Sequence, residues 1–174
     1  LDQLYSRLLT AFGHRNWWPS QSLEEVIFGA ILTQNVAWTS VEQAIAALRQ
    51  AGKLHFKSIA AMDEAELAAL IRPARFMNQK ARALKAFAKY FGTQYGFSIR
   101  RMKKCRTEKL REELLSLYRI GPETADSILL YALGKPVFVI DAYTKRICSR
   151  HGLLGPDDTY DVYQRFFMDR LAPD

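Results

Sequence analysis

The chain has 174 residues, enough for one domain with a substantial core or for two small lobes that share an interface. Its 25 Lys and Arg residues against 18 Asp and Glu residues give a net charge of +7, which suits a polyanionic partner such as DNA. No apolar run approaches the roughly 20 residues of a membrane helix, no secretory signal opens the sequence, and Cys105 and Cys148 fit neither a disulfide framework nor a CxxC metal site. These features predict an intracellular protein without a membrane partner.

Helical signals dominate the first half of the chain. Ser22 followed by Glu25 is typical of a capping box, and apolar residues then recur near helical spacing up to residue 48. The polar segment Thr33-Gln34-Asn35 interrupts that pattern. Asp63 with Glu66 predicts a second capped helix, and residues 78–91 predict a basic amphipathic helix. The pattern therefore indicates an all-α protein.

Three tryptophans, Trp17, Trp18 and Trp38, lie on either side of the first predicted helix. Aromatic clusters usually belong to a protein core, but flat apolar walls are also what a base taken out of the DNA stack requires. Phe76 follows Arg75 and precedes Lys80, so it could be a wedge inserted into a duplex or an ordinary buried residue. The residues alone leave both alternatives open.

The segment from residue 107 to residue 141 carries the strongest functional signal. Thr107 can cap a helix that breaks at Ile120-Gly121-Pro122, and Pro122 suits the first turn of the next helix. That helix closes near Gly134, and residues 137–140 are too few and too isolated to form a sheet. A helix–hairpin–helix of this kind holds DNA through its backbone, because turn amides and a helix N-terminus attract phosphate.

Asp141 and Glu123 are the candidate catalytic positions. Asp141 directly precedes a predicted helix, so it can be an N-cap, and capping amides also keep a carboxylate ionised for stabilising a developing cation. Glu123 lies in the first turn of the second hairpin helix, where a negative charge is also favourable for structure alone. A lysine at this position could form a Schiff base with an opened sugar, and a glutamate cannot.

Together these residues resemble the helix–hairpin–helix (HhH-GPD) DNA glycosylase superfamily, which includes endonuclease III. The hairpin, the linker at residues 134–136, Asp141, and the segments at residues 31–35 and 75–81 match the family in order and spacing, so the resemblance covers most of the chain. The Trp-Trp-Pro, TQN and FxNQKA segments and the hairpin glutamate are similar to the 3-methyladenine DNA glycosylase III branch. The resemblance implies an all-α, two-lobed, endonuclease III-like fold that binds DNA across a cleft and flips a nucleotide into it.

The resemblance also implies roles for individual residues. Asp141 matches the aspartate that assists cleavage of the N-glycosidic bond, and Glu123 occupies the position that is lysine in strand-nicking members. The base pocket would comprise Trp17, Trp18, Pro19 and Trp38. Gln34 and Phe76 would fill or wedge the gap left by the flipped base, and further DNA contacts are expected from Lys80, Arg119, Ile120, Gly121, Pro122, Thr124 and Lys145. Main-chain carbonyls of Leu115, Leu117 and Ile120 would hold a monovalent cation.

Two departures from the family pattern qualify these assignments. The hairpin usually has glycine where this chain has Arg119, and the iron–sulfur cysteines of endonuclease III are missing. Relatives continue with further helices, which carry a base-pocket lysine in the related branch, so we expect a truncated C-terminus. We assign residues 22–140 to a central domain with the hairpin, and residues 1–21 with 142–174 to a second lobe.

The predicted function is base excision DNA repair by a DNA N-glycosylase without AP lyase activity. Its expected substrate is double-stranded DNA with an alkylated base, 3-methyladenine above all. One alternative is an endonuclease III-like glycosylase for uracil, mismatched thymine or oxidised pyrimidines, and another is a non-catalytic module that binds damaged DNA. We expect a monomer of the cytoplasm, associated with a bacterial-type nucleoid, that requires no cofactor beyond the hairpin cation.

Overall fold

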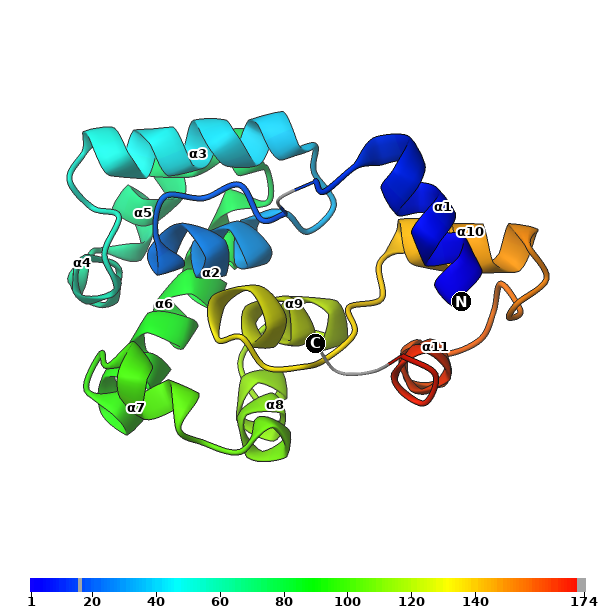
Figure 1. The fold of residues 1–174 in the computed structure, drawn as a ribbon. Coiled ribbons are helices and arrows are strands. Elements are labelled where there is room, and N and C mark those ends of the chain that lie inside the picture. Colours follow the sequence, from blue (N-terminus) through cyan, green and yellow to red (C-terminus); the bar gives the residue numbers. More distant parts are fainter. Residues whose placement is uncertain (16, 172–174) are drawn as a thin grey trace. The chain divides into compact units, whose positions relative to one another are not determined.

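The computed structural model describes residues 1–15 and 17–171, and these residues form helices and no strands (Figure 1). The predicted all-α fold is therefore confirmed. Contacts divide the chain into two compact units, Ser20–Lys135 and Leu1–Pro19 with Pro136–Asp174. Within the predicted second lobe, residue 16 and residues 172–174 lie outside the described residues. No helix in the described part of the chain is both long and apolar enough to cross a membrane.

The unit Ser20–Lys135 contains ten helical segments, two of them short non-α segments labelled η1 and η2. Helices α4 and α5 both pack against α6, and α2 contacts α3, α6, α9 and η2. In chain order the segments are α2 (Leu23–Leu32), α3 (Trp38–Gln50), α4 (Phe56–Ala61), α5 (Glu64–Leu70), η1 (Arg72–Ala74), α6 (Met77–Tyr95), α7 (Ile99–Lys103), α8 (Thr107–Leu115), α9 (Pro122–Ser127) and the π-helical η2 (Ile128–Ala132).

An aromatic cluster joins α2, α4 and α6 in the core of this unit. The ring of Phe56 lies 5.0 Å from that of Phe28 and 4.7 Å from that of Phe91, edge to face in both pairs. Phe28 and Phe91 are fully buried. Rings of this size bury large apolar areas, and edge-to-face contacts add roughly 1 kcal/mol beyond the burial itself. These contacts hold the long helix α6 against α2 and α4.

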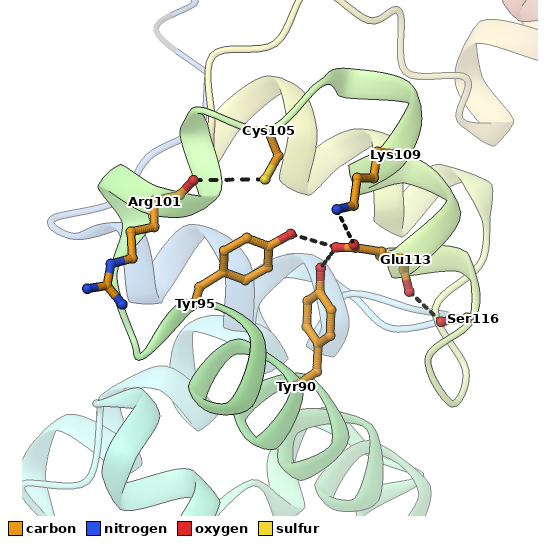
Figure 2. Close-up of polar contacts among 7 residues, drawn as sticks. All are labelled: Tyr90, Tyr95, Arg101, Cys105, Lys109, Glu113 and Ser116. Atoms are coloured by element: carbon orange, nitrogen blue, oxygen red, sulfur yellow. Dashed lines mark hydrogen bonds and ion pairs between the residues drawn. The ribbon is translucent and has the colours of Figure 1, made fainter.

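A partly buried polar cluster fastens α6 to α8 (Figure 2). The hydroxyls of Tyr90 and Tyr95 both donate to one carboxylate oxygen of Glu113, each at 2.6 Å, and Lys109 lies 3.7 Å from the other oxygen. Burial and then the bond to Glu113 raise the pKa of both tyrosines. Burial opposes ionisation of Glu113, but the two tyrosine hydrogen bonds and the Lys109 ammonium together outweigh it and lower the pKa of that carboxyl.

An ion pair joins α8 to α9 across the hairpin. Arg111 donates from Nε to Oδ1 of Asp126 at 2.8 Å and from Nη2 to Oδ2 at 3.2 Å. The Asp126 side chain is fully buried, whereas Arg111 is about one-quarter exposed. A two-point contact of this kind fixes angle as well as distance, because the planar guanidinium matches the carboxylate. The pair therefore sets how the two hairpin helices cross.

The other unit contains α1 (Asp2–Phe12), α10 (Ala142–Arg150) and α11 (Tyr160–Met168). Its core consists of the buried residues Ile140, Cys148, Tyr163 and Phe167. The ring of Phe138 stacks on that of Phe167 with centroids 4.1 Å apart. Because Phe138 and Ile140 pack here, residues 136–140 belong to this unit, and not to the central domain in which we expected them.

Several predicted helix starts can be compared with the structure. Ser22 and Asp63 are N-caps that accept backbone N–H groups, as expected. Glu25 does not close the reciprocal bond of a capping box, since its carboxylate accepts from the Gln21 N–H and pairs with Arg49. The expected cap at Thr107 is wrong. Helix α8 begins at Thr107 itself, after Arg106 as N-cap with no side-chain bond.

The Arg111–Asp126 pair gives a stability prediction. Arg111→Met removes the guanidinium from a buried carboxylate, so we expect a loss of about 3–5 kcal/mol in the free energy of unfolding, measured by urea denaturation. Arg106→Met is the matched control, because the Arg106–Glu108 pair is mostly exposed and such pairs contribute about 0–1 kcal/mol. Equal losses in the two variants would contradict the role given to the buried pair.

Candidate functional site

The hairpin turn between α8 and α9 contains one residue with a left-handed backbone conformation, and this residue is not a glycine. Arg119 has φ 57°, a conformation that costs a residue with a Cβ roughly 1 kcal/mol or more. The turn closes with hydrogen bonds from Leu117 N to Leu114 O at 3.0 Å and from Ile120 N to Leu117 O at 3.2 Å. Gly121 is then the N-cap of α9. Pro122 is its first residue, which confirms the prediction that Pro122 lies in the first turn of this helix.

Gln34 ties the interruption after α2 to this turn. Its side-chain amide donates to the main-chain oxygen of Arg119 and to the hydroxyl of Thr124, both at 3.1 Å. Both hydrogens of the amide are thus directed at the hairpin. Thr124 is buried, so its hydroxyl serves this internal contact. The polar TQN segment, which breaks the apolar pattern in the sequence, is therefore a structural link to the hairpin.

Lys80 holds two loops together from within. Only 5% of its surface is exposed, and its ammonium donates to the main-chain oxygens of Leu32 at 2.7 Å, Gln34 at 2.9 Å and Ala74 at 2.7 Å. An ammonium has three hydrogens, so these three carbonyls use all of them. Burial, and then the positive charge of Arg119, lower the pKa of Lys80 to about 8. The structure thus places this predicted DNA-contacting side chain in the interior.

A cavity of about 270 Å³ lies where these segments meet. Its lining residues are Gln34, Asn35, Phe76, Gln79, Lys80 and Arg119. Non-glycine residues with positive φ gather around it: Asn35 at 55°, Arg75 at 55°, Phe76 at 44° and Arg119 at 57°. Strained backbone of this kind persists only where its surroundings hold it, and it concentrates at functional sites. The two predicted gap-filling residues, Gln34 and Phe76, therefore line one pocket, and Phe76 is 54% exposed.

Asp141 is the N-cap of α10, as predicted. Its Oδ1 accepts from the backbone N–H of Thr144 at 2.6 Å and from the Thr144 hydroxyl at 2.7 Å. Within residues 1–15 and 17–171, Oδ2 accepts no hydrogen bond. The preceding segment is held by α11, because Ile140 N donates to the Tyr160 hydroxyl at 3.2 Å and Gln164 donates to Phe138 O at 2.8 Å. One carboxylate oxygen is thus oriented by the fold, and the other remains able to accept a hydrogen bond.

The predicted base-pocket residues fall in both units. The Trp17 and Trp18 rings lie 5.2 Å apart at 45°, with Trp17 52% exposed, and Pro19 follows them on the surface. Trp38, in the other unit, is the first residue of α3 and donates from its indole to Glu42 at 3.0 Å. Their role toward a base stays a prediction.

The remaining predicted contacts are placed as follows. Glu123 is exposed in the first turn of α9, and the Lys145 ammonium donates to Asp158 O at 2.7 Å. The carbonyl of Leu117 accepts from Ile120 N, whereas those of Leu115 and Ile120 accept no backbone N–H from the described residues. No group of three or more His, Cys, Asp or Glu side chains in the described part of the chain could hold a metal ion.

The sequence analysis did not predict the structural roles of Asp126 and Lys80, and it expected Lys80 only as a DNA contact. Asp126 was one signal, since a lone acid just before the apolar run Ile128–Ala132 needs a partner. Lys80 was another, because it shares a helix face with Leu84 and Phe91, both fully buried. A lysine on a buried face must direct its charge at oxygen atoms, and here it finds the carbonyls of two loops.

Residues 28–173 match the HhH-GPD superfamily of base excision DNA repair proteins. The chain belongs to this superfamily. A Methanocaldococcus jannaschii protein, whose name assigns it provisionally to the DNA repair glycosylases, is 46% identical over 99% of this chain and 79% of its own length. Endonuclease III of Sulfolobus acidocaldarius is 30% identical over 84% of the chain, which spans 64% of that protein.

Two solved structures of DNA glycosylases resemble this chain. The H. pylori 3-methyladenine DNA glycosylase MagIII, bound to 1,N6-ethenoadenine, superposes with a TM-score of 0.82 at 32% identity, over 97% of this chain and 78% of that one. An endonuclease III–DNA complex superposes with a TM-score of 0.84 over 99% of this chain and 77% of that one, and at 18% identity it shows the common fold. The chain is thus a DNA glycosylase of the HhH-GPD superfamily with DNA as its partner, and its resemblance to the MagIII branch is confirmed.

The left-handed Arg119 gives a second prediction. Arg119→Gly relieves the Cβ strain in the turn, whereas Arg119→Ala removes the guanidinium and keeps the strain. We expect the glycine variant to unfold with a free energy about 1 kcal/mol higher than the alanine variant, measured by urea denaturation. An alanine variant as stable as the glycine variant would show that the turn carries no such strain.

Proposed function

We propose that this glycosylase removes an alkylated, positively charged purine, with 3-methyladenine as its substrate, and that it leaves the DNA strand intact. The proposal is carried by Asp141, whose Oδ1 is held by Thr144 while Oδ2 accepts no hydrogen bond from the described residues. A fixed carboxylate with one open oxygen can stabilise the cation that develops on a sugar as its base departs. The 32% identity to the H. pylori 3-methyladenine glycosylase supports the choice of lesion.

The proposed chemistry follows from charge. An alkylated purine already carries a positive charge, so it leaves with the electrons of the glycosidic bond and needs little acid catalysis. The Asp141 carboxylate would stabilise the oxocarbenium-like sugar, orient the water that adds to it, or do both. The Trp17 and Trp18 rings offer negatively polarised faces, which favour a cationic base over a neutral one.

Glu123 supports the absence of AP lyase activity. It stands exposed in the first turn of α9, at the hairpin position where strand-nicking relatives have lysine. A carboxylate cannot form a Schiff base with the opened sugar, so base removal would end at an abasic site. The abasic strand would then break only when alkali is added.

The hairpin also suits a monovalent cation. The Leu115 and Ile120 carbonyls accept no backbone N–H from the described residues, and the Leu117 carbonyl accepts one, so lone pairs remain for a ligand. Carbonyl oxygens are the donors that hard cations prefer. These three oxygens would hold the cation, which would supply positive charge toward a DNA phosphate.

A panel of duplexes tests the substrate and the reaction together. Duplexes with 3-methyladenine, uracil or an oxidised pyrimidine are incubated with the protein, and released base and strand breaks are measured with and without alkali. We expect release of 3-methyladenine and strand breaks only after alkali. Release of uracil or the oxidised pyrimidine in its place would favour an endonuclease III-like enzyme, and no release at all would oppose the proposed substrate class.

Asp141→Asn tests the catalytic assignment. Asparagine is as good an N-cap as aspartate, so the fold should be kept while the negative charge is lost. We expect base release to slow at least about 100-fold with DNA affinity unchanged, measured by single-turnover kinetics and by titration of labelled duplex. Asp63→Asn, the same change at the N-cap of α5, is the matched control and should leave base release unchanged. Comparable rates in both variants would leave Asp141 as a cap alone.

A further inference from the structure

We propose that Lys80 is the positioning residue of this enzyme, whose ammonium fixes the two loops that carry Gln34 and Phe76 in the arrangement that enters damaged DNA. The inference rests on the proposed roles of Gln34 and Phe76 at the gap in the duplex. It does not depend on which base is released.

The three hydrogen bonds of Lys80 connect two separate loops. Leu32 O and Gln34 O belong to the end of α2 and the segment after it, whereas Ala74 O ends η1, directly before Arg75 and Phe76. The main-chain oxygen of Gln34 itself is one of the three acceptors. The ammonium also lies 6.0 Å from the centre of the Phe76 ring. Both residues that are proposed to meet the DNA gap are therefore anchored by one buried charge.

The strained backbone explains why such an anchor is needed. Asn35, Arg75 and Phe76 all have positive φ. Asn35 directly follows the Gln34 carbonyl that Lys80 binds, and Arg75 and Phe76 are the two residues after the Ala74 carbonyl. A residue held in this conformation stores backbone strain, which favours relaxation unless other contacts oppose it. Charge-assisted hydrogen bonds to buried carbonyls are strong enough to do so. Without the ammonium the loops would relax and the pocket would lose its shape.

The protonation state of Lys80 offers an independent test of its anchoring role. Lys80 has a pKa of about 8, and a neutral amine donates two hydrogens and turns a lone pair toward the third carbonyl. The charged group that faces Lys80 is Arg119 of the hairpin. The other neighbours contribute main-chain carbonyls, a phenyl ring and the amide side chains of Gln34, Asn35 and Gln79. Because the folded-state pKa lies below that of the unfolded chain, deprotonation above about pH 8 does not lower the free energy of unfolding. Loop positions can thus change while global stability is kept.

The test uses a duplex with an abasic-site analogue and 2-aminopurine as the neighbouring base, whose fluorescence rises when a wedge unstacks it. The analogue has no base to release, so the result is separate from the identity of the substrate. We expect Lys80→Met to reduce the fluorescence rise about tenfold at saturating protein, with affinity for undamaged duplex nearly unchanged. Lys85→Met is the matched control on the same helix, since the Lys85 ammonium donates to the carbonyl of Met62, away from the pocket.

Double variants distinguish positioning from general damage. If Lys80 acts through the wedge, Lys80→Met combined with Phe76→Ala should lose no more signal than Phe76→Ala alone. Additive losses, an unchanged signal in Lys80→Met, or equal losses in Lys85→Met would each overturn the proposal.

The pH profile decides the matter even if Lys80→Met does not fold. We expect the signal of the unaltered protein to fall between about pH 7 and about pH 9, and the signal of Lys80→Arg to stay level because arginine remains charged. Urea denaturation of the unaltered protein should show no parallel loss of stability over the same range. A level profile for the unaltered protein would overturn the proposal.

Discussion

The ion pair between Arg111 and Asp126 is the contact on which the arrangement of the hairpin helices depends. It fixes α8 against α9 in two hydrogen bonds. The turn between these helices then presents the Arg119 carbonyl to Gln34, and the first turn of α9 presents the Thr124 hydroxyl. The TQN segment is positioned by the hairpin in this way, and Lys80 links that segment to the loop before α6. Three polar contacts in series thus connect a buried carboxylate to the exposed Phe76.

Much of this architecture could be predicted from sequence, because it follows local rules. The helices, the N-caps at Ser22, Asp63 and Asp141, and the hairpin with Pro122 in the first turn of α9 depend on neighbouring residues alone. The contacts that assemble the site could not be predicted in the same way. Lys80 reaches carbonyls 46 and 48 residues away, and Gln34 reaches the hairpin across 85 to 90 residues. Such partners become visible only when the fold brings them together.

The same distinction explains the expectations that failed. Thr107 is a residue type that often caps helices, but here Arg106 is the N-cap. Helix α8 therefore starts at Thr107, one residue earlier than a cap at Thr107 would require. Residues 136–140 were assigned by their place before Asp141, whereas the stacking of Phe138 on Phe167 assigns them to the other unit. For residues 136–140, packing of apolar side chains, and not the local pattern, decided the outcome.

The tyrosine pair on Glu113 has a consequence for which parts of the protein open first. Its contribution to folding is complete above the ordinary pKa of a glutamate, about 4.3, and below that of a tyrosine, about 10, because the folded protein lowers the former and raises the latter. The pKa of Lys80, about 8, lies inside that interval. Mild alkali should therefore release the Gln34 and Phe76 loops as a local fluctuation, while α6 and α8 stay within one cooperative folding unit.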